Sequence, residues 1–186
     1  FFVNTPDINP FYLQSGNPAA FAIRAILAAT MSPTWGVYSG YELFEHQPLA
    51  IGKEEYLDSE KYEYRPRDFD HQPNLNLLMG RLNEIREQHP ALQQLRDIHF
   101  HHAAHDQIIV YSKHDGDDVV LVACSLDPDN TVESPVMIDF DALGFPDNHT
   151  VQVHDLLTGQ DYHWGRQSFV RLYPGQPAHI FHVTHG

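Results

Sequence analysis

Residues 19–31 are the feature that most limits what this chain can fold into. The segment AAFAIRAILAATM is apolar on nearly every side of a helix, and Arg24 is its only charge. Asn17 is a good N-cap, Pro18 suits the first helical turn, and Pro33 ends the helix. A helix of this kind is buried, as when it packs on a sheet within a large domain.

Two short strand candidates flank this helix, at residues 1–3 and 34–40. A long polar loop follows over 41–72, and leucines at helical spacing then predict a second helix between Pro73 and Pro90. The order strand, helix, strand, loop, helix indicates parallel strands. Because two parallel strands do not form a stable sheet alone, we expect neighbouring strands upstream of Phe1.

The remainder of the chain has the pattern of successive antiparallel strands. Turn signals such as Asp115-Gly116 and Pro174-Gly175 separate them. The strands are expected at about 98–102, 108–113, 118–126, 132–140, 150–157, 161–164, 168–172 and 178–184. The sequence therefore predicts an α/β domain over 1–97 and an all-β domain, a small antiparallel β-sandwich, over 98–186.

Charge and composition exclude several classes of protein. The formal net charge is −14, which disfavours binding to the phosphates of nucleic acids. No apolar run approaches the roughly 20 residues of a membrane span, and no signal peptide is evident, so we expect no membrane partner. The single cysteine, Cys124, fits a reducing, cytoplasmic setting and is expected to be a buried thiol. Because the chain starts at Phe1, we interpret it as a piece of a longer protein.

Asp7 is the first candidate for chemistry. It follows the first strand candidate directly, where α/β sheets gather their catalytic groups. Asn4 and Thr5 beside it can hydrogen-bond hydroxyl-rich ligands. The alternative is that Asn4-Thr5-Pro6-Asp7 is only a turn in which Asp7 caps a local structure.

The loop over 41–72 is the second candidate, because it combines aromatic and charged side chains. Flat aromatic faces stack on sugar rings, and charged groups bind their hydroxyls, so a carbohydrate site is one interpretation. A solvated loop with its tyrosines packed beneath it is the other. The side chains concerned are Tyr38, Tyr41, Phe44, Tyr56, Tyr62, Tyr64, Glu42, Glu45, Lys61, Arg65 and Arg67.

The histidines are the third candidate. Four of them lie in the segment His99–His105, and on a strand His99 and His101 share one face, where two metal ligands could converge. No cysteine and no zinc-type spacing supports such a site. We therefore predict no metal site and favour histidines on an edge strand that face solvent.

Several of these segments together resemble the catalytic barrel of the α-amylase clan. Phe2–Asp7 is similar to the clan's segment at the end of the seventh barrel strand, and Trp35–Glu42 to the segment on the eighth. Pro6 stands where ordinary amylases have histidine, and this Asn-Thr-Pro-Asp form resembles the α-1,4-glucan:maltose-1-phosphate maltosyltransferases. The stretch Glu54–Asp68 and the segment Trp164–Arg166 are more specific to that family.

The resemblance implies a fold and a function. Residues 1–97 would be the C-terminal part of a (β/α)8 TIM barrel, and 98–186 the β-sandwich that follows it. Asp7 would stabilise the transition state of a retaining α-glycosyl transfer, and Lys61, Tyr62 and Asn4 would bind the substrate. The nucleophile and the general acid/base would precede Phe1.

The resemblance further implies the substrates maltose 1-phosphate and α-1,4-glucan, no cofactor, and a possible homodimer of the full-length enzyme. Two alternatives stay open at this point. One is a hydrolase or trehalose-converting relative of the same clan. The other is a non-catalytic glucan-binding β-sandwich, for which Tyr162 and Trp164 are the best available sugar platform.

Overall fold

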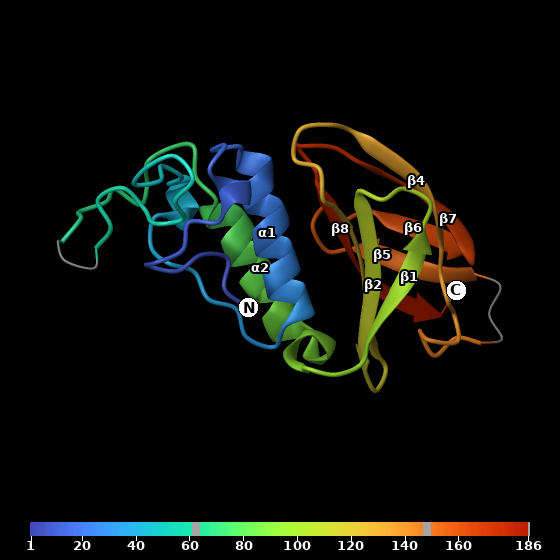
Figure 1. The fold of residues 1–186 in the computed structure, drawn as a ribbon. Coiled ribbons are helices and arrows are strands. Elements are labelled where there is room, and N and C mark those ends of the chain that lie inside the picture. Colours follow the sequence, from blue (N-terminus) through green and yellow to red (C-terminus); the bar gives the residue numbers. More distant parts are fainter. Residues whose placement is uncertain (61–63, 147–149, 186) are drawn as a thin grey trace.

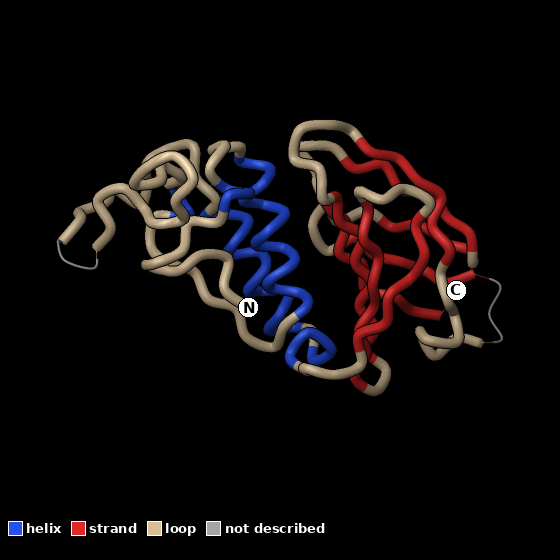
Figure 2. Tube along the Cα trace, viewed as in Figure 1, coloured by secondary structure: helices blue, strands red, loops and turns tan. Residues whose placement is uncertain are grey.

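The computed structural model describes residues 1–60, 64–146 and 150–185 and separates helices from strands along the chain (Figures 1 and 2). The helical elements are η1 (Phe11–Leu13), α1 (Pro18–Met31), η2 (Tyr41–Leu43), α2 (Asn76–Gln88) and η3 (Pro90–Gln93). The strands are β1 (Ile98–Ala103), β2 (Ile108–Asp115), β3 (Asp118–Ser125), β4 (Val132–Met137), β5 (Thr150–Asp155), β6 (Asp161–Gly165), β7 (Gln167–Leu172) and β8 (Ala178–His185). Both predicted helices and all eight predicted strands are present.

The α1 helix begins as its sequence predicts. The side chain of Asn17 accepts a hydrogen bond from the backbone N–H of Ala19, and Pro18 occupies the first helical position. Nine of its 14 residues are buried. Arg24, its only charged residue, donates a hydrogen bond to the carbonyl of Val3 and so ties the helix to the N-terminal segment.

The two predicted strands at 1–3 and 34–40 meet at a single parallel bridge, between Phe2 and Gly36. Backbone hydrogen bonds flank it, from Val3 N–H to the Gly36 carbonyl and from Gly36 N–H to the Phe1 carbonyl. A Cβ on residue 36 would lie 2.3 Å from the Phe2 ring, so a larger residue there would displace this ring. The parallel direction is as predicted, but the described residues form a bridge here rather than a sheet, since each strand lacks other neighbours.

The eight strands form one antiparallel sheet in the order β6-β5-β8-β3-β2-β1-β4-β7. β1 pairs with β2 through residues 98–101 and with β4 through 102–103, so the sheet turns at this strand and curls back over itself. Its end strands, β6 and β7, approach each other without pairing. The predicted all-β part is confirmed as a nearly closed antiparallel sheet, whereas the TIM-barrel part stays a prediction.

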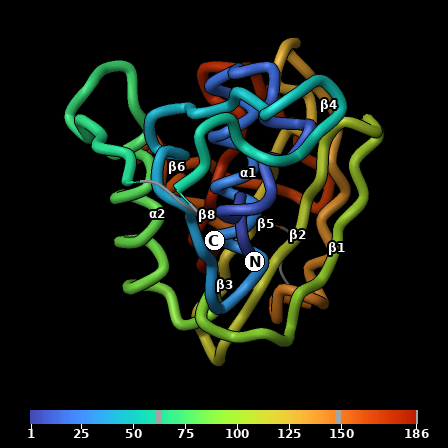
Figure 3. Tube along the Cα trace, turned by 60° about the vertical axis from the view of Figure 1, so that its left-hand side comes forward, coloured from blue at the N-terminus to red at the C-terminus, as the bar shows by residue number. Residues whose placement is uncertain are grey.

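Two apolar cores stabilise this arrangement. One lies inside the curled sheet and includes Phe140, Trp164 and Phe181. The other lies between the outer face of the sheet and α1, where Ile26 packs in the same cluster as Tyr111. Figure 1 shows α1 between α2 and the sheet, and Figure 3 gives the same molecule turned by 60°. Helical and β parts therefore share a core, and Cys124 is buried in it as predicted.

Over the described ranges 1–60, 64–146 and 150–185, neither α-helix combines the length and the apolar character that crossing a bilayer requires.

Candidate carbohydrate site and its relatives

Asp7 lies in a tight turn just beyond the parallel bridge. Thr5 and Ile8 exchange backbone hydrogen bonds of 3.1 and 3.2 Å. The Thr5 hydroxyl also accepts from the N–H groups of Asp7 and Ile8, at 3.3 and 3.0 Å. This Thr-based turn holds Asp7 at an exposed position. The turn expected from the sequence is therefore present, and it presents an acidic side chain at the end of a strand-like segment.

Asn4 is buried beneath this turn and is 2% exposed. Its amide donates to the Tyr56 hydroxyl at 2.8 Å and to the Tyr38 carbonyl at 3.3 Å, and its oxygen accepts from the Tyr38 N–H at 2.8 Å. Both of its donor hydrogens are thus used within the protein. In this arrangement Asn4 positions Tyr38 and Tyr56, and the substrate contact predicted for it stays a prediction.

The long loop folds back against the Asp7 turn. The Ser59 hydroxyl donates to the Pro6 carbonyl at 3.4 Å, and the N–H of Asn9 donates to the carbonyl of Glu54. Lys61 and Tyr62, the predicted substrate ligands, lie outside the described residues. Their neighbours in sequence, Ser59 and Glu60, are described, and Ser59 contacts the residue directly before Asp7. The described part of the loop at Ser59 therefore lies beside the Asp7 turn.

Arg67 fixes the shape of this loop, and its side chain is only 4% exposed. Its guanidinium donates to Glu45 at 2.8 and 3.1 Å and to Glu60 at 2.6 Å. It also lies over the ring of Tyr38, 5.8 Å from the centroid. We call these four residues the Arg67 clamp. Arg67 donates to both oxygens of the Glu45 carboxylate, and this bidentate geometry is the strongest form of an ion pair between arginine and a carboxylate.

Charge complementarity within the Arg67 clamp shifts two pKa values. The hydrogen bonds to Glu45 raise the pKa of Arg67 above its usual value. The hydrogen bond from Arg67 lowers the pKa of Glu60. Glu60 directly precedes Lys61, so the clamp fixes the last described residue before the predicted substrate-binding segment. Sequence reasoning placed Arg67 in the loop but did not identify it as its anchor.

The aromatic side chains of the loop divide between the two interpretations made from sequence. Tyr41 is fully buried, and Phe44 packs edge-on against Phe21 of α1, so both belong to the core. Tyr56 is 4% exposed, and burial raises the pKa of its hydroxyl. Tyr64, in contrast, is 88% exposed. Of the described members of the predicted aromatic platform, Tyr41, Phe44 and Tyr56 therefore pack beneath the loop.

Tyr162 and Trp164 do not form a flat exposed pair. Trp164 is 7% exposed and packs edge-on against Phe181 at 4.7 Å. Tyr162 is 39% exposed and contacts the same ring at 6.1 Å. The platform expected for a sugar-binding module thus consists of one half-exposed ring, which weakens that alternative.

The prediction of solvent-facing histidines on an edge strand is wrong for His101. β1 lies inside the sheet, and His101 is 9% exposed. Its Nε2 lies 2.9 Å from the Ser112 hydroxyl, and its Nδ1 accepts from the N–H of Asp139 at 3.1 Å. Burial lowers its pKa to about 4. His99 and His101 lie on one face of β1, as the alternation of side chains along a strand predicts. However, β4 pairs with β1, so β1 is not an edge strand.

Comparisons with known proteins bear on this site. A protein-family model described as "GLGE, C-terminal" matches residues 100–183. The chain is 55% identical to α-1,4-glucan:maltose-1-phosphate maltosyltransferase 2 of Streptomyces coelicolor, over 98% of this chain and 28% of that protein. It is 54% identical to the maltosyltransferase of Corynebacterium glutamicum, over 97% of this chain and 28% of that protein. The predicted resemblance is confirmed.

Solved structures agree at the level of fold. An Anoxybacillus α-amylase is similar over 100% of this chain and 38% of its own, with a TM-score of 0.68 and 15% identity. The γ-CGTase of alkalophilic Bacillus clarkii is similar over 100% of this chain and 26% of its own, with a TM-score of 0.68 and 17% identity. At such identities the likeness shows the fold alone. The chain spans just over a quarter of the length of the maltosyltransferases that it matches.

Proposed function

We propose that this chain is the C-terminal part of an α-1,4-glucan:maltose-1-phosphate maltosyltransferase, a retaining enzyme that lengthens α-1,4-glucans. The observation that carries the proposal is the identity of 50–55% to such enzymes over nearly the whole chain. Neighbouring solved structures of α-amylase type support the same clan by fold.

In this proposal, residues 1–97 complete a (β/α)8 barrel and 98–186 form the domain that follows it. The parallel bridge between Phe2 and Gly36 supports the barrel, because a parallel pair joined through a helix such as α1 is its repeating unit. Asp7 then lies at the carboxyl end of a barrel strand, where the active sites of such barrels lie.

The reaction has two displacements at the anomeric carbon. A carboxylate nucleophile attacks maltose 1-phosphate, the bond to phosphate breaks, and a glycosyl-enzyme forms. The 4-hydroxyl of the glucan then attacks this intermediate and loses its proton to the general base, so that the α-configuration is retained. Both of these carboxyl groups would lie outside residues 1–186, so we expect the isolated chain to be inactive.

Asp7 would act on the donor ring during both displacements. A carboxylate near the ring favours the positive charge that develops in the oxocarbenium-like transition state. Lys61 and Tyr62 would contact the maltosyl unit, and the Arg67 clamp fixes Glu60, the described residue directly before them. Asn4 would support this arrangement from below through Tyr38 and Tyr56.

Product analysis of the full-length protein tests this proposal. With maltose 1-phosphate and a maltooligosaccharide acceptor, we expect inorganic phosphate and glucans lengthened by two glucose units. Free maltose without lengthened glucan would instead support the hydrolase alternative. No turnover, together with affinity of residues 98–186 for α-glucan, would support the binding-module alternative.

A further inference from the structure

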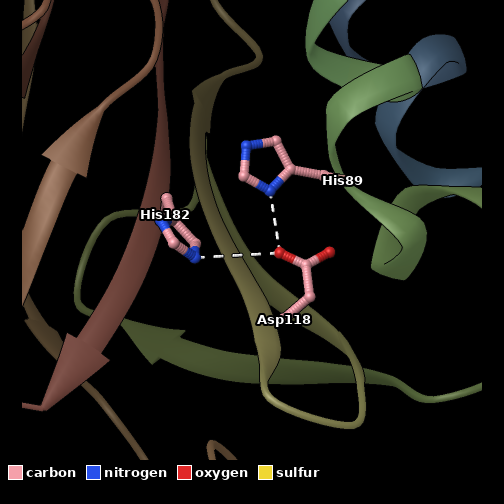
Figure 4. Close-up of side chains that lie close together, drawn as sticks. All are labelled: His89, Asp118 and His182. Carbon is pink, nitrogen blue, oxygen red and sulfur yellow. Dashed lines mark hydrogen bonds and ion pairs between the residues drawn. The ribbon is translucent and has the colours of Figure 1, made fainter.

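Three potential metal ligands meet at one end of the boundary between the helices and the sheet (Figure 4). They are His89, Asp118 and His182, and each offers one ligand atom within 4.8 Å of the others. His89 Nδ1 lies 2.8 Å from Asp118 Oδ1, and His182 Nε2 lies 3.8 Å from the same oxygen. These residues lie far from Asp7 in sequence, and none of them takes part in the proposed reaction.

The fold holds each of these side chains by a separate element. His89 joins α2 to η3, and its N–H donates to the Ile85 carbonyl at 3.0 Å. Asp118 begins β3, and its second oxygen accepts from the N–H of Ala91 at 2.9 Å. His182 lies on β8 opposite Val120 of β3, so it shares the helix-facing side of the sheet with Asp118.

The spacing suits a tetrahedral ion after small movements. Ligand atoms about 2.1 Å from Zn²⁺ lie about 3.4 Å from one another. The contact between His89 and Asp118 would have to lengthen by about 0.6 Å, and that between Asp118 and His182 to shorten by about 0.4 Å, to reach this value. The third pair, His89 and His182, lies within 4.8 Å and would have to close to the same value.

We propose that His89, Asp118 and His182 bind one divalent transition-metal ion of the zinc type, with water as the fourth ligand. Two imidazoles and one carboxylate select such ions over Mg²⁺ and Ca²⁺, which prefer oxygen ligands. The hydrogen bond from Ala91 orients the carboxylate, as outer contacts do in metal sites. The ion joins the end of α2 to β3 and β8, so it stabilises the contact between the helical and β parts.

Titration of the metal-free 186-residue chain tests this site. We expect one tight equivalent of Zn²⁺ by competition with a chromophoric chelator, and a tetrahedral d–d absorption spectrum with Co²⁺. At a hundredfold excess over Kd, Zn²⁺ should raise the melting temperature by about 5–10 °C. Mg²⁺ at the same concentration should leave it unchanged.

Two variants and one control identify the ligands. His89→Gln and His182→Gln should each weaken Zn²⁺ binding at least about tenfold, because loss of even an outer-shell partner of a ligand costs about 10–100-fold. His99→Gln is the matched control, because His99 also pairs with a carboxylate, Asp139 at 3.4 Å, but does not belong to the cluster. It should bind Zn²⁺ like the parent chain. The His182 side chain is 35% exposed and that of His89 is 9% exposed, so we expect His182→Gln to perturb the fold less than His89→Gln.

The proposal is overturned if the parent chain shows no tight equivalent of Zn²⁺. It is also overturned if His182→Gln retains that equivalent, or if His99→Gln loses it. Equal stabilisation by Mg²⁺ would contradict the ligand chemistry and indicate a site made of carboxylates alone.

Discussion

A double-mutant cycle on Thr30 and Tyr111 tests how the helical and β parts are joined. Their hydroxyls lie 2.5 Å apart at the contact between α1 and β2. Tyr111 is fully buried, and Thr30 also donates to the carbonyl of Ile26 at 2.7 Å. Among the residues that the structure describes, Thr30 is the only hydrogen-bonding partner of the Tyr111 hydroxyl.

The two single variants should differ in cost. Tyr111→Phe removes one hydroxyl and leaves Thr30 bonded to Ile26, so the free energy of unfolding should fall by about 1 kcal/mol. Thr30→Val leaves a buried hydroxyl without a partner, which should cost about 2.5 kcal/mol. The double variant removes both polar groups and should cost about 1.5 kcal/mol, well below the sum of the singles, about 3.5 kcal/mol. The coupling energy is then about 2 kcal/mol.

Urea unfolding followed by tryptophan fluorescence measures these energies. The chain has two tryptophans, Trp35 in the helical part and Trp164 in the sheet, so Trp35→Phe and Trp164→Phe backgrounds report each part separately. Because the parts share a core, both probes should show one transition with one midpoint. Separate midpoints, or a coupling energy near zero, would refute the shared core.

Three further predictions concern single residues. Burial raises the pKa of the Cys124 thiol, so it should react with a thiol reagent only after unfolding; rapid reaction in the native chain would contradict this. Gly40→Ala should lower the melting temperature more than Gly52→Ala, although both glycines have positive φ. The reason is that a Cβ at residue 40 would lie 2.2 Å from Glu45 Oε2, whereas a Cβ at residue 52 would have no described atom within 4 Å. The pKa of His101 is about 4 in the native state, below the value of 6.5 in the unfolded state. The contribution of neutral His101 to the free energy of unfolding is therefore complete above pH 6.5. It is lost as the pH falls to about 4, by up to about 3 kcal/mol. His101→Asn should flatten that part of the pH profile of stability, and an unchanged slope would count against this pKa.

Local signals in the sequence were sufficient for the elements of this fold. Asn17 and Pro18 mark the start of α1, and turn signals mark five of the seven connections between the eight strands. The order of the strands was not predictable, because it depends on β1 changing partner from β2 to β4. That exchange covers the edge that was expected to be open, and it explains why His101 is buried.

In the candidate site, too, local features could be predicted from the sequence and tertiary contacts could not. The position of Asp7 after a strand candidate was a local signal, and the turn around Thr5 agrees with it. The role of Arg67 could not be predicted, because Glu45 and Glu60 lie 22 and 7 residues away in sequence. The cluster of His89 with Asp118 and His182 was missed for the same reason, since its members lie on three elements that only the tertiary fold brings together.

Replacement of Asp7 in the full-length protein tests the proposed chemistry most directly. Maltosyl transfer is measured as phosphate release from maltose 1-phosphate in the presence of glucan, for Asp7→Asn and for Asp70→Asn, a second exposed aspartate, as the control. We expect kcat for Asp7→Asn to fall by about 10²-fold or more, as when a group that stabilises transition-state charge is lost, and Asp70→Asn to match the parent enzyme. A kcat for Asp7→Asn within about twofold of the parent, a difference of less than 0.5 kcal/mol in activation free energy, would show that Asp7 does not serve this reaction.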